Sequence, residues 1–185
     1  MTVVTVALIA VCGLSAGALW WAVSRFGEGR GLARTPGSMA TFAGIPVLLL
    51  LLAALAGLST GAATGPLLVA AVLATALTTV TGGGLVATAV LRLADPTFDQ
   101  TPSPPTPAQG EVLRGGAWIG VLERLAILAA LLAGWYEGVA VALGLKGLGR
   151  YPELRRSEAS ERFIIGTFAS ILWVVATYAV FVTIR

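Results

Sequence analysis

Apolar and polar segments alternate along this chain in long blocks. Apolar runs with few or no charges cover residues 3–24, 39–58, 66–93, 117–134, 136–149 and 163–184. A helix needs about 20 apolar residues to cross a ~30 Å hydrocarbon core. The pattern therefore predicts an all-α, polytopic integral membrane helical bundle with about six transmembrane helices, forming a single domain over residues 1–185. The run at 136–149 is either a short fifth span or a re-entrant segment, because it is too short for a full crossing.

Several local signals refine this picture. The first run reads as a retained helix and not as a signal peptide, because no basic residue precedes its apolar core. Trp20 and Trp21 are placed to anchor it at a membrane interface. Pro46 is a tolerated kink, and the run Gly82-Gly83-Gly84 favours a bend or close helix packing. Residues 94–116 contain five prolines and are predicted to form a cytoplasmic loop.

Composition narrows the range of chemistry. Apolar residues make up 57% of the chain and charged residues 11%, and there is no histidine. The commonest metal ligand and general base is therefore missing, and the single cysteine, Cys12, excludes an intrachain disulfide. The sequence also lacks a Walker loop, a nucleophile elbow and a His-Glu zinc motif. We predict no catalytic residue, no metal and no cofactor, and lipids rather than nucleic acid as partners.

The basic residues predict an orientation, because cytoplasmic loops of membrane proteins are enriched in Lys and Arg. Ten of the twelve basic residues lie in or beside the segments 25–38, 94–116 and 149–162: Arg25, Arg30, Arg34, Arg92, Arg114, Lys146, Arg150, Arg155, Arg156 and Arg162. The turns at 59–65 and 135–138 carry none, and Arg185 is the exception at the end of the chain. We therefore predict a bacterial inner-membrane protein with both termini outside.

The most informative charges are Glu123 and Arg124, which stand together inside an apolar run. A charge near mid-bilayer costs roughly 2.5–3.5 kcal/mol on translocon scales, so such residues usually face protein, water or each other. Two further predicted helices, the fifth and the sixth, place charges at the same leaflet depth. The predicted cluster consists of Glu123, Arg124, Lys146, Arg150, Glu161 and Arg162.

Consecutive helical residues point about 100° apart, so Glu123 and Arg124 must face different partners. We expect Glu123 to meet Lys146 or Arg162, with Arg150 as a further candidate, and Arg124 to meet Glu161 or a lipid phosphate. The cluster has two interpretations. Buried ion pairs often hold helices in register, whereas an intramembrane charge also marks ligand-binding and transport sites.

Three motifs in the last 70 residues carry a family resemblance. Gly120-Val-Leu-Glu-Arg124, Lys146-Gly-Leu-Gly-Arg150 and Glu161-Arg-Phe-Ile-Ile-Gly-Thr-Phe-Ala-Ser170 resemble the C-terminal part of an uncharacterised bacterial multi-pass membrane family, a domain of unknown function. The first 110 residues do not match it. The resemblance implies that the charge cluster is a recurring unit, and it implies no activity.

The leading hypothesis is a non-catalytic membrane protein. Its cytoplasmic-leaflet charge cluster would bind an anionic lipid headgroup, or would dock a partner membrane protein or a second copy of the chain. The alternative is a small proton- or cation-coupled transporter that uses Glu123. A lipid-modifying enzyme is disfavoured by the missing histidines and by the lack of a paired-carboxylate metal motif. The Gly13-x-x-x-Gly17 and Gly166-x-x-x-Ser170 patterns allow close helix contacts.

Overall fold

Six helices make up the regular structure of the described residues. The computed structural model describes residues 1–30, 36–94, 116–149, 151 and 157–185. The helices are α1 (Thr2–Arg30), α2 (Pro36–Gly57), α3 (Pro66–Ala94), α4 (Gly116–Leu132), α5 (Glu137–Gly149) and α6 (Ser157–Val182). The predicted all-α class with six helices is thereby confirmed. Helix α3 runs through Gly82-Gly83-Gly84 without interruption, so these glycines do not end or split it.

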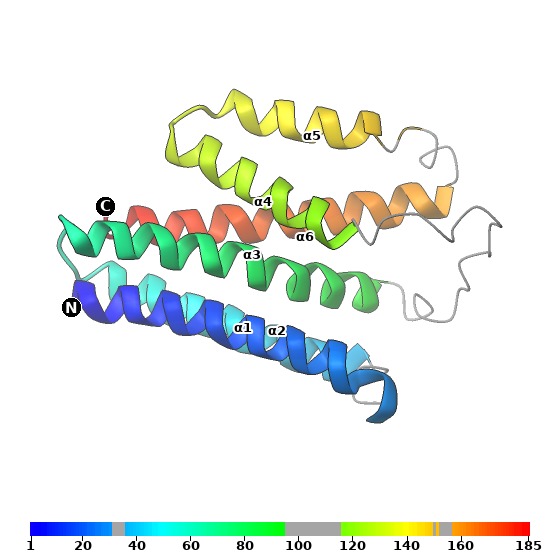
Figure 1. The fold of residues 1–185 in the computed structure, drawn as a ribbon, viewed down its shortest axis with the longest axis horizontal. Coiled ribbons are helices and arrows are strands. Elements are labelled where there is room, and N and C mark those ends of the chain that lie inside the picture. Colours follow the sequence, from blue (N-terminus) through cyan, green and yellow to red (C-terminus); the bar gives the residue numbers. More distant parts are fainter. Residues whose placement is uncertain (31–35, 95–115, 150, 152–156) are drawn as a thin grey trace.

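The helices fall into two groups by length. By length and composition, α1, α2, α3 and α6 are long and apolar enough to cross a membrane, as expected of a multi-pass membrane protein. Helix α4 has 17 residues and α5 has 13, and at 1.5 Å per residue α5 rises only about 20 Å. They form an antiparallel hairpin beside the four longer helices, and its turn stops short of the ends of α3 and α6 (Figure 1).

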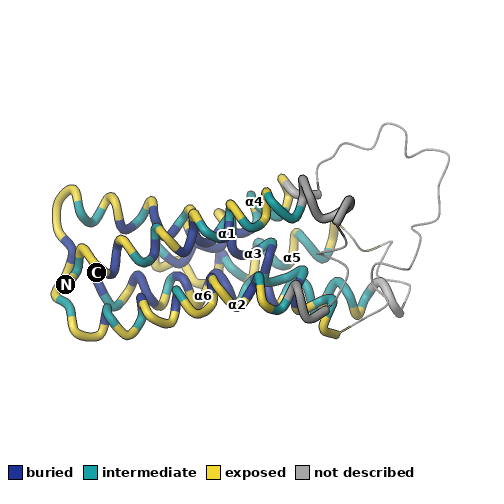
Figure 2. The backbone as a smooth tube through the Cα atoms, turned by 90° about the horizontal axis from the view of Figure 1, so that it is seen from below, coloured by how far each residue is buried: buried dark blue, intermediate teal, exposed yellow. Residues whose placement is uncertain are grey.

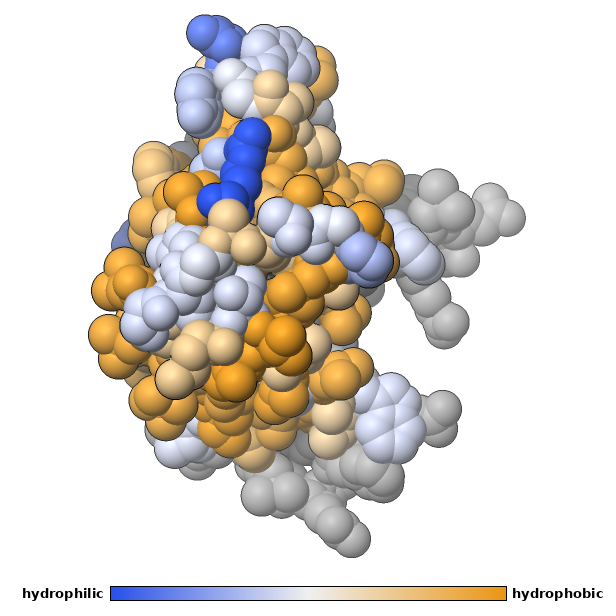
Figure 3. Space-filling view, turned by 90° about the vertical axis from the view of Figure 1, so that its left-hand side faces the viewer, coloured by the Kyte–Doolittle hydropathy of each residue, from blue (hydrophilic) through white to orange (hydrophobic). Residues whose placement is uncertain are grey.

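Consecutive helices run in opposite directions, which gives the bundle two distinct ends (Figure 1). The terminal end carries both chain termini. The loop end carries the last residues of α1, α3 and α5 and the first residues of α2, α4 and α6. Figure 3 looks onto the terminal end, where apolar surface predominates and hydrophilic residues form only small patches. Both termini therefore lie at the same end of the bundle, as the sequence predicts.

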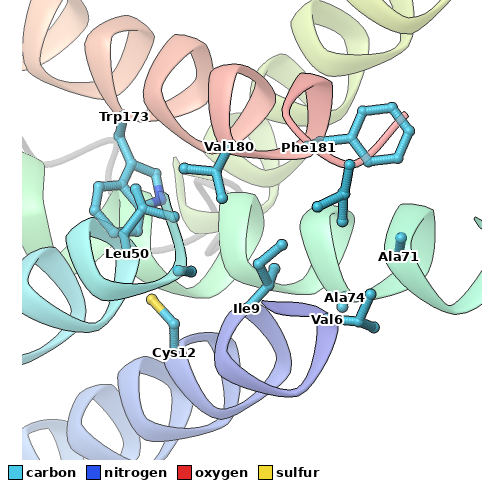
Figure 4. Packing of buried hydrophobic residues seen from close by; sticks show 11 residues of the cluster. Val6, Ile9, Cys12, Leu50, Ala71, Ala74, Trp173, Val180 and Phe181 are labelled. Atoms are coloured by element: carbon cyan, nitrogen blue, oxygen red, sulfur yellow. The ribbon is translucent and has the colours of Figure 1, made fainter. Parts of the chain in front are cut away.

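Helix α3 lies at the centre of the bundle and packs against α1, α2, α4 and α6. The main core fills the space between α1, α2, α3 and α6 (Figure 4), with the buried residues Val6, Ile9, Cys12, Leu50, Ala53, Ala71, Ala74, Trp173, Val180, Phe181 and Ile184. Pro46 is also fully buried, and its carbonyl oxygen accepts a hydrogen bond from the Cys12 thiol at 3.2 Å. This contact joins α1 to α2 at the point where the proline ring interrupts the hydrogen bonding of α2.

Threonine hydroxyls on α3 connect it to its neighbours. Thr78 Oγ1 donates either to Ile9 O at 2.7 Å or within α3, and Thr79 Oγ1 lies 2.7 Å from Thr177 Oγ1 on α6. Such bonds suit an apolar interior, where an unpaired hydroxyl is costly. The close approach of α1 depends on Gly13, because a Cβ there would lie 2.8 Å from Thr78 Oγ1. The contact predicted for the Gly13-x-x-x-Gly17 pattern is confirmed.

A second apolar cluster holds the α4–α5 hairpin on the bundle. Ile127, Leu128 and Leu131 of α4 pack against Val174 of α6, with Val139 and Ala142 of α5 beside them. Buried residues line the inside of the bundle, and exposed residues follow its outside (Figure 2). The outside includes many large apolar side chains, such as Leu48 and Leu55 on α2 and Phe168 and Leu172 on α6. An apolar surface of this extent suits contact with lipid tails.

Candidate functional site

The predicted charges lie near the loop end of the bundle, and helix geometry sets their depth. Thr5, Gly57 and Thr183 share one level near the terminal end, because a Cβ on Gly57 would touch both threonine side chains. About 20 helical residues cross a ~30 Å core. Counted from this level, the core ends near residue 25 of α1 and near Phe163 of α6. The site described below lies roughly 6–10 Å inside that boundary, at the depth of Trp20 and Thr167.

Glu123 faces α5 and α6 and is paired there. The Lys146 ammonium donates to Glu123 Oε2 at 2.5 Å, and each side chain is only 20% exposed. The ammonium also lies 5.8 Å from the centre of the Phe163 ring. The space beside the pair measures about 10 Å³, which is at the lower limit for one water molecule. The pair is therefore closed and electrically neutral, and Lys146 is one of the two partners expected for Glu123.

Arg124 faces the opposite direction, toward α1 and α3. Its side chain is 9% exposed, and its Nε atom has no hydrogen-bond partner among the described residues. The stem of the side chain lies over Gly83 of α3. The terminal nitrogens point back along α4, where a Cβ on Gly120 would lie 3.4 Å from Nη1 and 3.7 Å from Nη2. Gly120 is one turn nearer the loop end, so the guanidinium is directed toward the membrane interface, as snorkelling arginines are.

A cleft opens around this guanidinium between α1, α3 and α4. Its volume is about 330 Å³, and the residues that line it are Gly17, Trp20, Val80, Thr81, Gly84, Ala87, Thr88, Gly120, Val121 and Arg124. Arg124 is the only charged residue among them. A buried cation with an unsatisfied donor, facing a cleft with no carboxylate among its described lining residues, has the chemistry to hold an anionic group.

The three consecutive glycines of α3 give the site its shape. Because successive residues point about 100° apart, each glycine faces a different helix. A Cβ on Gly82 would overlap the Trp173 indole of α6, and one on Gly83 would overlap the Arg124 stem. A Cβ on Gly84 would lie 3.8 Å from the Trp20 ring of α1. Of the two roles predicted for these glycines, close packing is the one observed.

Of the remaining members of the predicted cluster, Glu161 does not join the Arg124 group. Glu161 is exposed on α6, and no ion pair connects it to Arg124, although both residues are described. The expected Arg124–Glu161 contact is therefore wrong, because Arg124 turns toward α3 while Glu161 lies on the outside of α6. Arg162 is half-buried near the start of α6. Arg150 lies outside the described residues. Within the described ranges, no three His, Cys, Asp or Glu side chains gather as a metal site.

Sequence reasoning missed the residues that complete the cleft. Trp20 was interpreted as an interfacial anchor, and neither Thr81 nor Thr88 was selected. One signal was available: the spacing from Trp20 back to Gly13 and Gly17 places all three residues on one stripe of α1. Only the packing of α1 on α3 shows that this stripe faces Arg124. No known protein family, curated protein or solved structure matches the chain.

Proposed function

We propose that this chain is a non-catalytic integral membrane protein that binds the anionic headgroup of a membrane lipid at Arg124. The supporting observation is Arg124, a residue about nine-tenths buried whose Nε has no partner among the described residues, at the wall of a 330 Å³ cleft. A phosphate accepts two parallel hydrogen bonds from a guanidinium, which makes arginine the usual residue for this recognition. The apolar remainder of the lining suits the glycerol backbone and the first methylenes of a lipid.

The proposed orientation places this cleft in the cytoplasmic leaflet. It rests on the ten basic residues in or beside the three segments that connect helices at the loop end. In this orientation, the α4–α5 hairpin enters the membrane from the cytoplasmic side and returns to the same side. Cysteine labelling from outside the cell, in a Cys12→Ser background, should modify residue 62 and leave residues 30, 104 and 155 unmodified. Modification of any of the last three from outside would contradict the orientation.

The alternative function, transport coupled to protons or cations through Glu123, receives less support. A coupling carboxylate must be able to exchange its ion with a water-filled path. Glu123 is instead paired with Lys146 beside a space of about 10 Å³. Proteoliposomes that contain the native chain should therefore show no proton or cation flux above empty vesicles. A flux that disappears in Glu123→Gln would replace the lipid-binding proposal with the transport alternative.

Native mass spectrometry of the purified protein tests lipid binding directly. We expect the native chain to retain phosphatidylglycerol through delipidation, and Arg124→Gln to lose it, with an affinity at least about tenfold lower, as expected when a charge-assisted contact is removed. The matched control is Arg185→Gln, which removes the same charge at the terminal end. Equal retention by native chain and Arg124→Gln would refute the proposal. A co-purifying protein subunit whose retention depends on Arg124 would favour docking of a partner instead.

A further inference from the structure

The lining of the cleft contains hydroxyl groups as well as the Arg124 cation. The two hydroxyl groups in the lining belong to Thr81 and Thr88. Thr88 Oγ1 donates to Gly84 O at 2.8 Å, within its own helix. Thr81 Oγ1 donates to Gly13 O at 2.9 Å or to Leu77 O at 2.8 Å. Each hydroxyl proton is therefore already engaged by a backbone carbonyl.

A hydroxyl whose proton is engaged can offer only lone pairs to a ligand. Phosphate and carboxylate oxygens are acceptors as well, so Thr81 and Thr88 do not favour the anionic group itself. They favour a part of the ligand that can donate a hydrogen bond, such as an alcohol group. The cleft therefore offers two chemically different kinds of group. Arg124 supplies donors, and α3 supplies acceptor hydroxyls at Thr88, about one and a half turns from Gly83 toward the loop end, and at Thr81, about half a turn from Gly83 in the other direction.

The charge of the site sets the charge of its ligand. Glu123 is neutralised by Lys146, so Arg124 contributes a single positive charge to the cleft. The Trp20 ring forms a flat wall beside Gly84, of the kind that packs against the C–H groups of a polyol. The volume of about 330 Å³ far exceeds the ~10 Å³ that one water molecule needs on the same measure, so the cleft has room for a polar headgroup.

We infer that the cleft selects a singly charged phosphodiester lipid whose headgroup carries free hydroxyl groups, of the glycerol type. In this arrangement the phosphate binds Arg124 and a headgroup hydroxyl donates to Thr88, which lies toward the loop end of the cleft. This inference rests on the proposed function, since it presupposes that an anionic lipid occupies the cleft.

The test compares lipids that differ only in the headgroup. Phosphatidylglycerol has one negative charge and two hydroxyls, phosphatidylmethanol has the same charge and no hydroxyl, and phosphatidylcholine is neutral overall. With matched acyl chains, titrated into the delipidated protein and read by native mass spectrometry, we expect phosphatidylglycerol to bind about fivefold more tightly than phosphatidylmethanol, as one hydrogen bond gives. Phosphatidylcholine should bind at least about tenfold more weakly than phosphatidylglycerol, because it has no net charge for Arg124 to neutralise.

Thr88→Val is the informative variant, because it keeps the shape of the side chain and removes a hydroxyl that bonds only within α3. It should lower phosphatidylglycerol affinity to the phosphatidylmethanol value and leave phosphatidylmethanol unchanged. Equal binding of the two lipids by the native chain, with both lost in Arg124→Gln, would overturn the headgroup inference and leave the proposed function standing. Binding of both lipids that is unaffected by Arg124→Gln would overturn the proposed function as well.

Discussion

The two faces of α4 differ more than any other pair of neighbouring surfaces in this bundle. On one face, Glu123 meets Lys146 in a closed, neutral contact that joins α4 to α5. On the other, Arg124 is more deeply buried than either member of that pair, yet its Nε has no partner in the described part of the chain, and it borders a 330 Å³ cleft. Two adjacent charges at one membrane depth therefore have different physical roles. A paired charge can hold helices in register, and a buried cation beside open space can accept an anionic group.

The largest expected effect tests the paired face. Glu123→Leu leaves the Lys146 ammonium buried without a counter-charge and should destabilise the protein by about 3 kcal/mol. The double variant Glu123→Leu/Lys146→Met should recover most of this loss, because no uncompensated charge remains. Thermal unfolding in detergent measures both, with Glu161→Leu on exposed α6 surface as the control. A single variant as stable as the native chain would show that the pair does not hold the hairpin.

A second prediction compares Gly82, which faces the Trp173 indole, with Gly83, which faces Arg124 at the cleft. Gly82→Ala places a methyl against the rigid Trp173 indole and should cost about 2 kcal/mol. Gly83→Ala meets the Arg124 stem, which can swing into the cleft, and should cost less than half as much. Gly44→Ala on α2 has open space around it and should not destabilise. Equal losses in the free energy of unfolding for Gly82→Ala and Gly83→Ala, measured by chemical unfolding, would indicate that the cleft cannot accept the displaced Arg124 side chain.

For the face of α4 that carries Arg124, we predict a change in stability opposite in sign to that of Glu123→Leu. Arg124→Met removes a buried cation with an unsatisfied donor, so the lipid-free protein should become more stable by about 1 kcal/mol. Anionic lipid should stabilise the native chain and have no effect on this variant. Melting curves with and without phosphatidylglycerol measure both quantities. Destabilisation by about 3 kcal/mol, as expected for Glu123→Leu, would mean that Arg124 has a structural partner and that the two faces do not differ.

The smallest effects separate interior hydroxyls from hydroxyls that face the cleft. Thr79→Val breaks the buried contact with Thr177 and should cost about 1 kcal/mol, whereas Thr88→Val should change stability by less than about 0.5 kcal/mol. Unfolding of the two variants under identical conditions provides the comparison. A larger loss for Thr88→Val than for Thr79→Val would show that Thr88 supports the fold and does not serve the cleft.

The sequence by itself determined the number of helices, their approximate bounds and a short set of cationic partners for Glu123, which includes Lys146. Long apolar runs separated by polar segments admit few other folds in a membrane, because backbone groups in lipid must be satisfied within each helix. The Glu123–Lys146 pair was predictable because only a few charges are available at that depth. The 100° step between neighbours also required that Arg124 face elsewhere.

Only the tertiary structure decided which helix Arg124 faces and that a cleft lies there. Helices α1 and α2 are apolar around most of their circumference, so no polar face in their sequences reveals their rotation. The rotation follows from packing: Gly13 admits Thr78, Gly82 admits Trp173, and Gly83 admits the Arg124 stem. Absence of a side chain is a weak signal in a glycine-rich chain. Its meaning depends on which neighbour fills the space, and that neighbour lies tens of residues away in the sequence.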